Sequence, residues 1–342
     1  MSLTPVVVNL EDLKSGKVDD ALPDAFGADS LGIIIVSGID ARFKQLRARV
    51  LSSASQLAHL PAEVLEKLED PEAFWLVGWS CGKEKLASGF PDDKKGSFYV
   101  NCSFYKDSRL EGPEEHTVTA NDLKGYTASN IWPEEKLIPN FQKDLKELIC
   151  LMIDVAVTVA QACDRYIAKH HAGSVPVGYL EKIVKESNTT KARLLHYFSF
   201  KKEQSTVNKN EDDWCGEHVD HSCLTALTSE LLLNEDDSTQ QEVFVDSSDE
   251  RARQAGLHIK NRHGETVKVT IPKDCLAFQT GSALEVISGG RFKAVPHYVK
   301  AYEKPGLNRN TLAVFCQPSL TDKVSDTQDF ASYARSIIEK NH

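Results

Sequence analysis

Apolar residues recur at helical spacing in several parts of the chain. Between residues 40 and 60 they fall near one face, which predicts an amphipathic helix. Pro61 can begin a second, short helix because proline is tolerated in a first turn. Residues 141–170 predict a long helix that is apolar enough to back a sheet. Shorter helices are expected at residues 176–187 and 326–340.

A different pattern fills the stretch from Ala192 to about Pro318, where short apolar runs alternate with turn residues. This spacing is typical of an antiparallel sandwich or jelly roll. Within it, residues 234–255 are rich in Asp, Glu, Ser and Gln. We interpret this segment as a solvated hairpin because charge-rich surface loops are common, with a lid over a substrate as the alternative. Residues 70–130 are mixed in pattern, and no internal repeat is present.

Composition narrows the class of protein. A chain of 342 residues with 41% apolar content can bury a large core, in one large domain or two. The net charge of -10 and the pI near 5.6 argue against a nucleic-acid substrate, since backbone binding needs clustered Lys and Arg. The pairs Lys94-Lys95 and Lys201-Lys202 are short, and we interpret them as solvated faces.

The cysteines and the termini favour a reduced, cytoplasmic protein. No Cys-x-x-Cys pairing occurs, and the thiols lie among apolar stretches, as buried free cysteines do. The N-terminus lacks a basic segment followed by an apolar core. The longest apolar stretch, residues 148–162, contains Asp154 and is too short to span a bilayer, so we expect no membrane partner. The eight cysteines are Cys81, Cys102, Cys150, Cys163, Cys215, Cys223, Cys275 and Cys316.

Three residues match a known set of metal ligands. His218 and Asp220 are two positions apart, so on a strand they point to the same face and can reach one metal. His297 lies in a strand-like run and can supply the third ligand from a different strand. Two imidazoles and one carboxylate form the facial triad of non-haem iron(II) oxygenases, which leaves the other face of the metal open. Cys215 and Cys223 flank His218 and Asp220, but thiolates would suit a closed zinc site instead.

A second pair strengthens this interpretation. Arg309 follows His297 by twelve residues, and Thr311 shares its strand face. A guanidinium fork beside a hydroxyl is a good receptor for a carboxylate, because the guanidinium binds both oxygens. A dicarboxylate that chelates the metal at one end would need such a clamp at the other.

Taken together, these motifs resemble the 2-oxoglutarate and iron(II)-dependent dioxygenase superfamily, in its isopenicillin N synthase-like branch. The run from His218 to Leu227 matches His-x-Asp-x-x-x-Leu-Thr-x-Leu. Residues 281–288 match Gly-Asp-x-Leu-Glu-x-x-Ser, and Arg309-Asn310-Thr311 stands for Arg-x-Ser. The resemblance covers nearly the whole chain, with further similar segments at residues 4–10, 32–39, 130–133, 139–141 and 192–197.

The chain departs from the family pattern at five positions, none of which is a metal ligand or the arginine. Thr311 replaces Ser and keeps the hydroxyl, while Leu195 replaces an Asn that contacts the co-substrate. Ser282 replaces Asp, Phe198 replaces Pro, and Tyr298 replaces Arg. These differences separate the chain from the plant specialised-metabolism enzymes and from their substrates.

The resemblance implies a mainly β fold with flanking helices (α+β), in which a double-stranded β-helix (jelly-roll) core is backed by a long helix. We expect an N-terminal mixed α/β region packed on the core at residues 1–140 and backing helices at 141–190. The catalytic core would span residues 191–320, and a C-terminal helix residues 321–342.

The resemblance also implies the chemistry. Iron(II) would bind His218, Asp220 and His297, with no catalytic residue beyond these ligands. The co-substrate 2-oxoglutarate would place its far carboxylate on Arg309 and Thr311, with a hydrogen bond from Tyr197. Together with O2, and with ascorbate as a reductant, the site would oxidise a small molecule and release succinate and CO2.

Neighbouring residues have simpler interpretations. His221 and His196 are out of phase with the predicted site residues and should face away from them. For Arg193 we favour an ion pair at the surface or behind the site, and for Asp274 a local turn. Three aromatics either line the barrel or pack in the core: Phe278, Phe292 and Phe315.

Two alternative functions stay open. An iron oxidase that does not use 2-oxoglutarate, similar to isopenicillin N synthase or aminocyclopropane carboxylate oxidase, would carry the same Arg-x-Ser pair. A non-catalytic jelly-roll protein could keep the metal for structure or sensing, although such a protein has no reason to keep both ligands and clamp.

Overall fold

The structure is a computed structural model that describes residues 4–84, 92–114, 117, 123–173, 175–199, 213–235, 239–245, 248–302 and 304–341. Lys201 and Lys202 lie outside this part of the chain, as does part of the acidic segment at residues 234–255.

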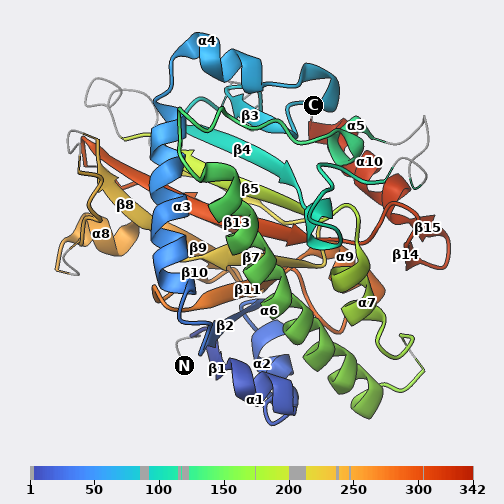
Figure 1. The fold of residues 1–342 in the computed structure, drawn as a ribbon. Helices are drawn as coiled ribbons and strands as arrows, with labels where there is room; N and C mark the ends of the chain where they lie inside the picture. Colours follow the sequence, from blue (N-terminus) through green and yellow to red (C-terminus); the bar gives the residue numbers. More distant parts are fainter. Residues whose placement is uncertain are drawn as a thin grey trace.

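Among the described residues, nine strands form a large mixed sheet (Figure 1). Its order is β1-β2-β11-β7-β13-β5-β4-β3, and β8 pairs with the other end of β13. The run from residue 307 to 316 alternates between two buried faces, which is why β13 can sit at the centre of the sheet. The strands are β1 (Val6–Asn9), β2 (Ile33–Ser37), β3 (Gly78–Cys81), β4 (Lys95–Asn101), β5 (Lys191–Tyr197), β7 (Leu224–Thr228), β8 (Leu231–Asn234), β11 (Leu276–Thr280) and β13 (Leu307–Cys316).

A smaller sheet of four strands lies against the larger one, in the order β10-β9-β12-β6. Both sheets contribute side chains to one cavity, from β5, β7 and β13 on one side and from β6, β9 and β12 on the other. This is the expected double-stranded β-helix core. The strands are β6 (Asp213–His218), β9 (Gly256–Lys260), β10 (Thr266–Lys268) and β12 (His297–Lys300), with a separate hairpin of β14 (Lys323–Ser325) and β15 (Gln328–Asp329).

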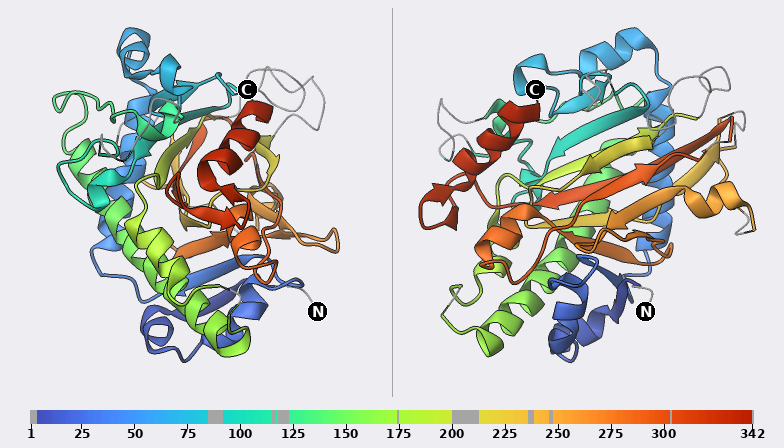
Figure 2. Two further views of the ribbon diagram at one scale, coloured as in Figure 1. Left: turned by 90° about the vertical axis from the view of Figure 1, so that its right-hand side faces the viewer. Right: turned by 180° about the vertical axis from the view of Figure 1, so that it is seen from behind.

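Helices α3 and α6 cover one face of the large sheet, and the view from behind shows the strands on the other side (Figures 1 and 2). The long helix predicted at residues 141–170 is α6, and it buries Leu145, Leu148, Ile149 and Met152 completely. The predicted helix at 40–60 is α3, so both periodicity predictions are confirmed. The helices are α1 (Leu10–Ser15), α2 (Leu22–Phe26), α3 (Phe43–Ala58), α4 (Ala62–Leu65), α5 (Lys124–Thr127), α6 (Phe141–His170), α7 (Tyr179–Glu186), α8 (Glu250–Gln254), α9 (Ser282–Ile287) and α10 (Phe330–Asn341), with short 3-10 turns at Asp19–Ala21, Glu66–Leu68, Pro71–Ala73 and Ser103–Tyr105.

The strand-rich region contains two short helices that periodicity did not indicate. Residues 282–287 form α9, although the pattern predicted only strands there. The acidic segment is not a plain hairpin, because Glu242 bridges to Leu233 and residues 250–254 form α8. Its apolar residues Val243 and Val245 pack onto a buried cluster near Tyr197. None of its described residues lines the cavity.

The sequence left two roles possible for three aromatic residues, core packing or lining the barrel, and both roles occur. Phe278 and Phe292 are buried in the core between the sheet and the helices, where Phe292 makes an edge contact with Phe26 at 5.9 Å. Phe315 lines the cavity. Among the described helices, none is both long and apolar enough to cross a membrane.

Candidate functional site

The structure brings His218, Asp220 and His297 together at the cavity wall. His218 is the last residue of β6, and His297, the first of β12, lies directly opposite it in the antiparallel pair. Their Nε2 atoms lie 3.7 and 3.8 Å from Asp220 Oδ1. Asp220 itself lies two residues beyond the end of β6, so the expectation that it shares a strand with His218 is wrong. The chain turns after His218 and still presents the carboxylate to both rings.

Hydrogen bonds behind these side chains fix their orientation. His218 Nδ1 donates to the carbonyl oxygen of Gly216 at 2.8 Å, which leaves the Nε2 lone pair free. Asp220 Oδ2 accepts a hydrogen bond from Thr225 Oγ1 at 2.6 Å, which leaves Oδ1 facing the rings. Three donor atoms therefore converge without competing partners from the described residues.

Gln279 fixes the orientation of His297 in a similar way. Its side-chain amide lies 2.7 Å from His297 Nδ1, and its Oε1 is buried with no partner when Nε2 faces the ring. Turning the amide so that Oε1 accepts from Nδ1–H satisfies that oxygen and frees the Nε2 lone pair of His297, because amide O and N positions are assigned from their hydrogen bonds. Gln279 is on β11, and the sequence analysis gave it no role.

Electrostatics favour a cation at this point. Burial works against the charged form of Asp220, but the two imidazoles outweigh it and lower the carboxyl pKa. Burial also lowers the pKa of His297, to about 4. At His218 the effect of burial is outweighed by Cys215 and Asp220, which raise the pKa to about 9, so a cation that binds Nε2 at neutral pH displaces a proton from it. Two imidazole nitrogens and a carboxylate oxygen on one side of an open cavity fit iron(II).

Cysteine does not join this donor set. Among the described residues, the atoms that gather within 4.8 Å here belong to His218, Asp220 and His297 alone. Cys215 lies beside them, with its Sγ 3.9 Å from His218 Nδ1, and lines the cavity. Burial raises the Cys215 pKa, but Lys95 and His218 outweigh it and lower it to about 7. Cys215 is therefore not a simple packing cysteine.

Arg309 and Thr311 line the same cavity from β13, as their shared strand face predicts. Arg309 Nε donates to Glu230 Oε2 at 2.6 Å, and the guanidinium lies over the Tyr197 ring at 4.9 Å. Its Nη1 is buried without a partner in the described part of the chain. A buried, unpaired cationic N–H is costly, so this donor is suited to an anionic ligand in the cavity.

A buried group of charges lies beside the triad, and it corrects the interpretation of Lys95. Lys95 is only 5% exposed and forms ion pairs with Asp92 and Glu84, so it is no solvated face. Arg193 lines the cavity and pairs with Glu84 at 2.8 Å, behind the site and not at the surface. Tyr99 Oη also donates to Glu84, at 2.7 Å.

The remaining predicted residues face away from the triad. His221 Nε2 lies 3.0 Å from the Tyr126 hydroxyl, and His196 is buried on the other face of β5 from Tyr197. Asp274 makes a local contact with Cys275. Four residues that shape the site had no assigned role in the sequence: Glu84, Thr225, Glu230 and Gln279. Only Thr225 carried a signal, as part of the Leu-Thr motif.

Known proteins share both sequence and fold with this chain. Residues 190–318 match the family model described as 2OG-Fe(II) oxygenase superfamily. Gibberellin 2-beta-dioxygenase 1 of Arabidopsis thaliana is 28% identical over 156 residues, which span 45% of this chain and 40% of that enzyme.

Solved structures extend the similarity to nearly the whole chain. A putative 2OG-Fe(II) oxygenase family protein from Caulobacter crescentus has a TM-score of 0.71 at 18% identity, over 99% of each chain. A full-length Neurospora crassa protein in complex with alpha-KG and thymine has a TM-score of 0.67 at 20% identity, over 94% of this chain and 87% of that one. At such identities the likeness shows a common jelly-roll fold.

Proposed function

Because the chain belongs, through residues 190–318, to the 2OG-Fe(II) oxygenase superfamily, we propose that it is a non-haem Fe(II), 2-oxoglutarate-dependent oxygenase of a small molecule, which releases succinate and CO2. We place its catalytic core at residues 191–320. The observation that carries the proposal is the buried Arg309 Nη1, which has no partner among the described residues and lines the same cavity as the converging triad.

The proposed iron ligands are His218 Nε2, His297 Nε2 and Asp220 Oδ1. Gly216, Thr225 and Gln279 hold these side chains in place from behind, so little conformational entropy is lost when the metal binds. When bound, iron(II) with 2-oxoglutarate and O2 would supply the oxidising chemistry, with ascorbate as a reductant.

The proposed role of Arg309 is to bind the far carboxylate of 2-oxoglutarate, with Thr311 adding a hydroxyl donor. Glu230 holds the guanidinium through Nε and leaves Nη1 available, and the Tyr197 ring supports its flat face. Tyr197 is thus proposed to position Arg309, in addition to a hydrogen bond to the co-substrate.

The cavity supports a small and largely apolar substrate. Apolar residues make up a large part of its wall beside the polar groups, and the charged Arg193 is already paired with Glu84. The Neurospora crassa protein of similar fold is solved with thymine, which is a small molecule. The apolar lining residues are Leu195, Leu227, Leu257, Val269, Ile271, Val299, Ala313 and Phe315.

An anaerobic titration tests the proposal. Iron(II) and then 2-oxoglutarate are added to apo-protein while the visible spectrum is recorded, and chelation should produce a weak charge-transfer band. Arg309→Gln should raise the 2-oxoglutarate concentration for half-saturation at least about tenfold, since charge-assisted hydrogen bonds are worth about 1.5–3 kcal/mol. Arg49→Gln, which removes an exposed arginine paired with Asp144, is the matched control.

The second candidate, an iron oxidase that does not use 2-oxoglutarate, is favoured by one contact. Glu230 already offers Arg309 a carboxylate, as the co-substrate would. Iron binding without a charge-transfer band on addition of 2-oxoglutarate would move the assignment to this class.

A further inference from the structure

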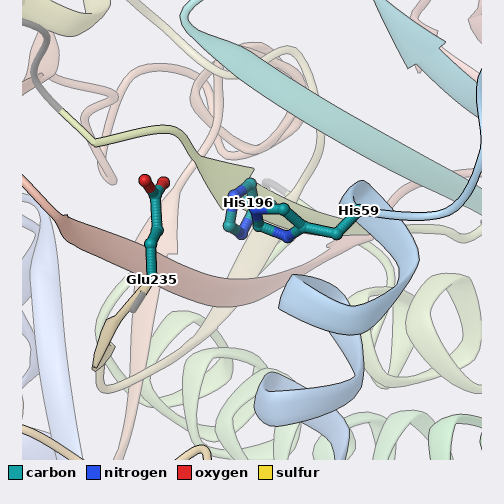
Figure 3. Close-up of side chains that lie close together, drawn as sticks. All are labelled: His59, His196 and Glu235. Carbon is teal, nitrogen blue, oxygen red and sulfur yellow. The ribbon is translucent and has the colours of Figure 1, made fainter. Parts of the chain in front are cut away.

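A second set of two histidines and one carboxylate lies away from the proposed iron site. His59 directly follows α3, His196 is near the end of β5, and Glu235 follows β8 (Figure 3). Their potential ligand atoms lie within 4.8 Å of one another. The two rings are nearly perpendicular, with centroids 5.4 Å apart. Three segments distant in the sequence therefore bring metal-ligand side chains to one point.

The hydrogen bonds of His196 leave one ring nitrogen as a free acceptor. Asn310 Nδ2 donates to the carbonyl of Leu231 and to Asn308 Oδ1, which orients the Asn310 amide. Its Oδ1 then faces His196 Nδ1 at 2.8 Å and can only accept, so Nδ1 carries the proton. His196 Nε2 is buried and has no partner among the described residues, although the residue is only 1% exposed. Buried polar atoms in folded proteins almost always have a partner, so the free Nε2 lone pair of His196 calls for a ligand.

The other two side chains are held in a similar way. His59 Nδ1 donates to the carbonyl of Ser55 at 2.7 Å, so its Nε2 also keeps a lone pair. The Glu235 carboxylate accepts from the backbone N–H and the hydroxyl of Ser199, at 3.1 and 2.5 Å. Each oxygen of a carboxylate has a second lone pair, so both bonds can persist while one oxygen binds a cation.

We propose that His59, His196 and Glu235 form a second metal site, which binds a divalent transition metal of the zinc type. Two imidazole nitrogens disfavour Mg²⁺ and Ca²⁺, which take oxygen ligands, and suit Zn²⁺ with water as a fourth ligand. Tetrahedral Zn²⁺ at about 2.0–2.1 Å places its ligands about 3.3 Å apart. The exposed His59 can make the required approach, whereas His196 is fixed.

This site lies behind the proposed co-substrate clamp. In the register of β5 with β13, His196 pairs with Asn310, between the pairs Tyr197–Arg309 and Leu195–Thr311. Successive residues of a strand point to opposite faces, so the two sites share the same two strands from opposite sides. A metal here would tie the end of α3 to β5 and β8, the two strands that pair with β13 around Arg309.

Metal counting tests the proposal independently of the oxygenase function. The double variant His218→Ala/Asp220→Ala removes the first site, and after equilibration with Zn²⁺ and dialysis it should retain one equivalent by elemental analysis. Adding His59→Ala or Glu235→Gln should lower this to near zero. Adding His263→Ala, which removes an exposed histidine paired with Asp29, should leave one equivalent.

The visible spectrum with Co²⁺ and the Tm with Zn²⁺ provide a second test of the proposed site. Co²⁺ in the double variant should give the visible bands of a low-coordinate nitrogen and oxygen site, and Zn²⁺ should raise its Tm. In the presence of His59→Ala both effects should vanish while the metal-free Tm stays unchanged, because His59 is exposed. No stoichiometric metal in the double variant, or binding that survives both His59→Ala and Glu235→Gln, would overturn the proposal. Neither result would affect the first site.

Discussion

Each residue of the proposed site is held in place by a neighbouring group. The side chains of Gln279 and Thr225 and the backbone carbonyl of Gly216 each hydrogen-bond the second polar atom of a proposed iron ligand. The Glu230 carboxylate holds Arg309 in the same way. The energetic reason is that a buried polar group must be paired, and that pairing also decides which atom stays free.

Gln279→Leu tests this positioning role. In a His59→Ala background, which leaves one proposed site, Co²⁺ affinity should fall about 10–100-fold because His297 loses its orienting partner. Equilibrium titration followed by absorbance measures this. Gln317→Leu, which removes another buried glutamine of the fold, should leave the affinity unchanged. Equal affinities for the two variants would contradict the role.

Because Lys191 is buried, the free energy of unfolding should depend on pH. Burial lowers its pKa to about 7, although Nζ donates to Leu76 O and Asn101 Oδ1. The unfolded chain, with a lysine pKa near 10.5, binds more protons than the folded chain between these values, so stability should rise with pH there. From pH 7 to pH 9 the gain is about 2 kcal/mol. Urea unfolding of wild type and Lys191→Met should show this gain as a difference between the two, and a difference that does not change with pH would refute it.

Helix α3 supports the proposed clamp from behind the sheet through Arg47. This residue in the first half of the helix is buried, and its guanidinium donates to the carbonyls of Ser229 and Glu230. These two residues form the turn between β7 and β8, from which Glu230 reaches Arg309. One helix therefore fixes the position of a residue that contacts the proposed clamp.

Arg47→Leu should destabilise the fold by about 3 kcal/mol, because Glu242 and two buried carbonyls lose their partner. It should also weaken 2-oxoglutarate binding several-fold, since the turn that carries Glu230 is released. Urea unfolding and the anaerobic titration measure the two effects. Arg49→Leu, on the exposed side of the same helix, should change stability by less than about 1 kcal/mol. A purely structural Arg47 would leave the titration unaltered.

At the scale of the whole molecule, the two sheets meet at the cavity, so its ligands should stabilise the fold. Iron(II) would bind residues of the small sheet and the adjoining loop, and 2-oxoglutarate would connect them to β13 of the large sheet. A ligand at 100 times its Kd contributes about 2.7 kcal/mol of stability.

Anaerobic thermal unfolding checks this coupling. Addition of 2-oxoglutarate to the iron-loaded protein should raise the Tm by a few degrees, since each kcal/mol is worth about 2–4 °C in a domain of roughly 150–250 residues and less in a larger one. In Arg309→Gln the iron should still stabilise, whereas the further shift from 2-oxoglutarate should shrink or disappear. An equal shift in both proteins would exclude Arg309 from co-substrate binding.

Local patterns in the sequence were enough to locate the long helices and the superfamily motifs. Helical spacing located α3 and α6 because periodicity is a local property of the chain, and the superfamily followed from motifs that stay short and contiguous. The phase of β13 put Arg309 and Thr311 on one face for the same reason.

Packing in three dimensions determines which groups meet across long sequence distances. Lys95 looked like part of a solvated pair, yet Asp92 and Glu84 allow its burial beside the triad. Glu230 meets Arg309, and His59 meets His196, only because β8, β13, β5 and α3 are packed together. A side chain's partners depend on packing between distant segments, so the local alternation of apolar and polar positions cannot predict them.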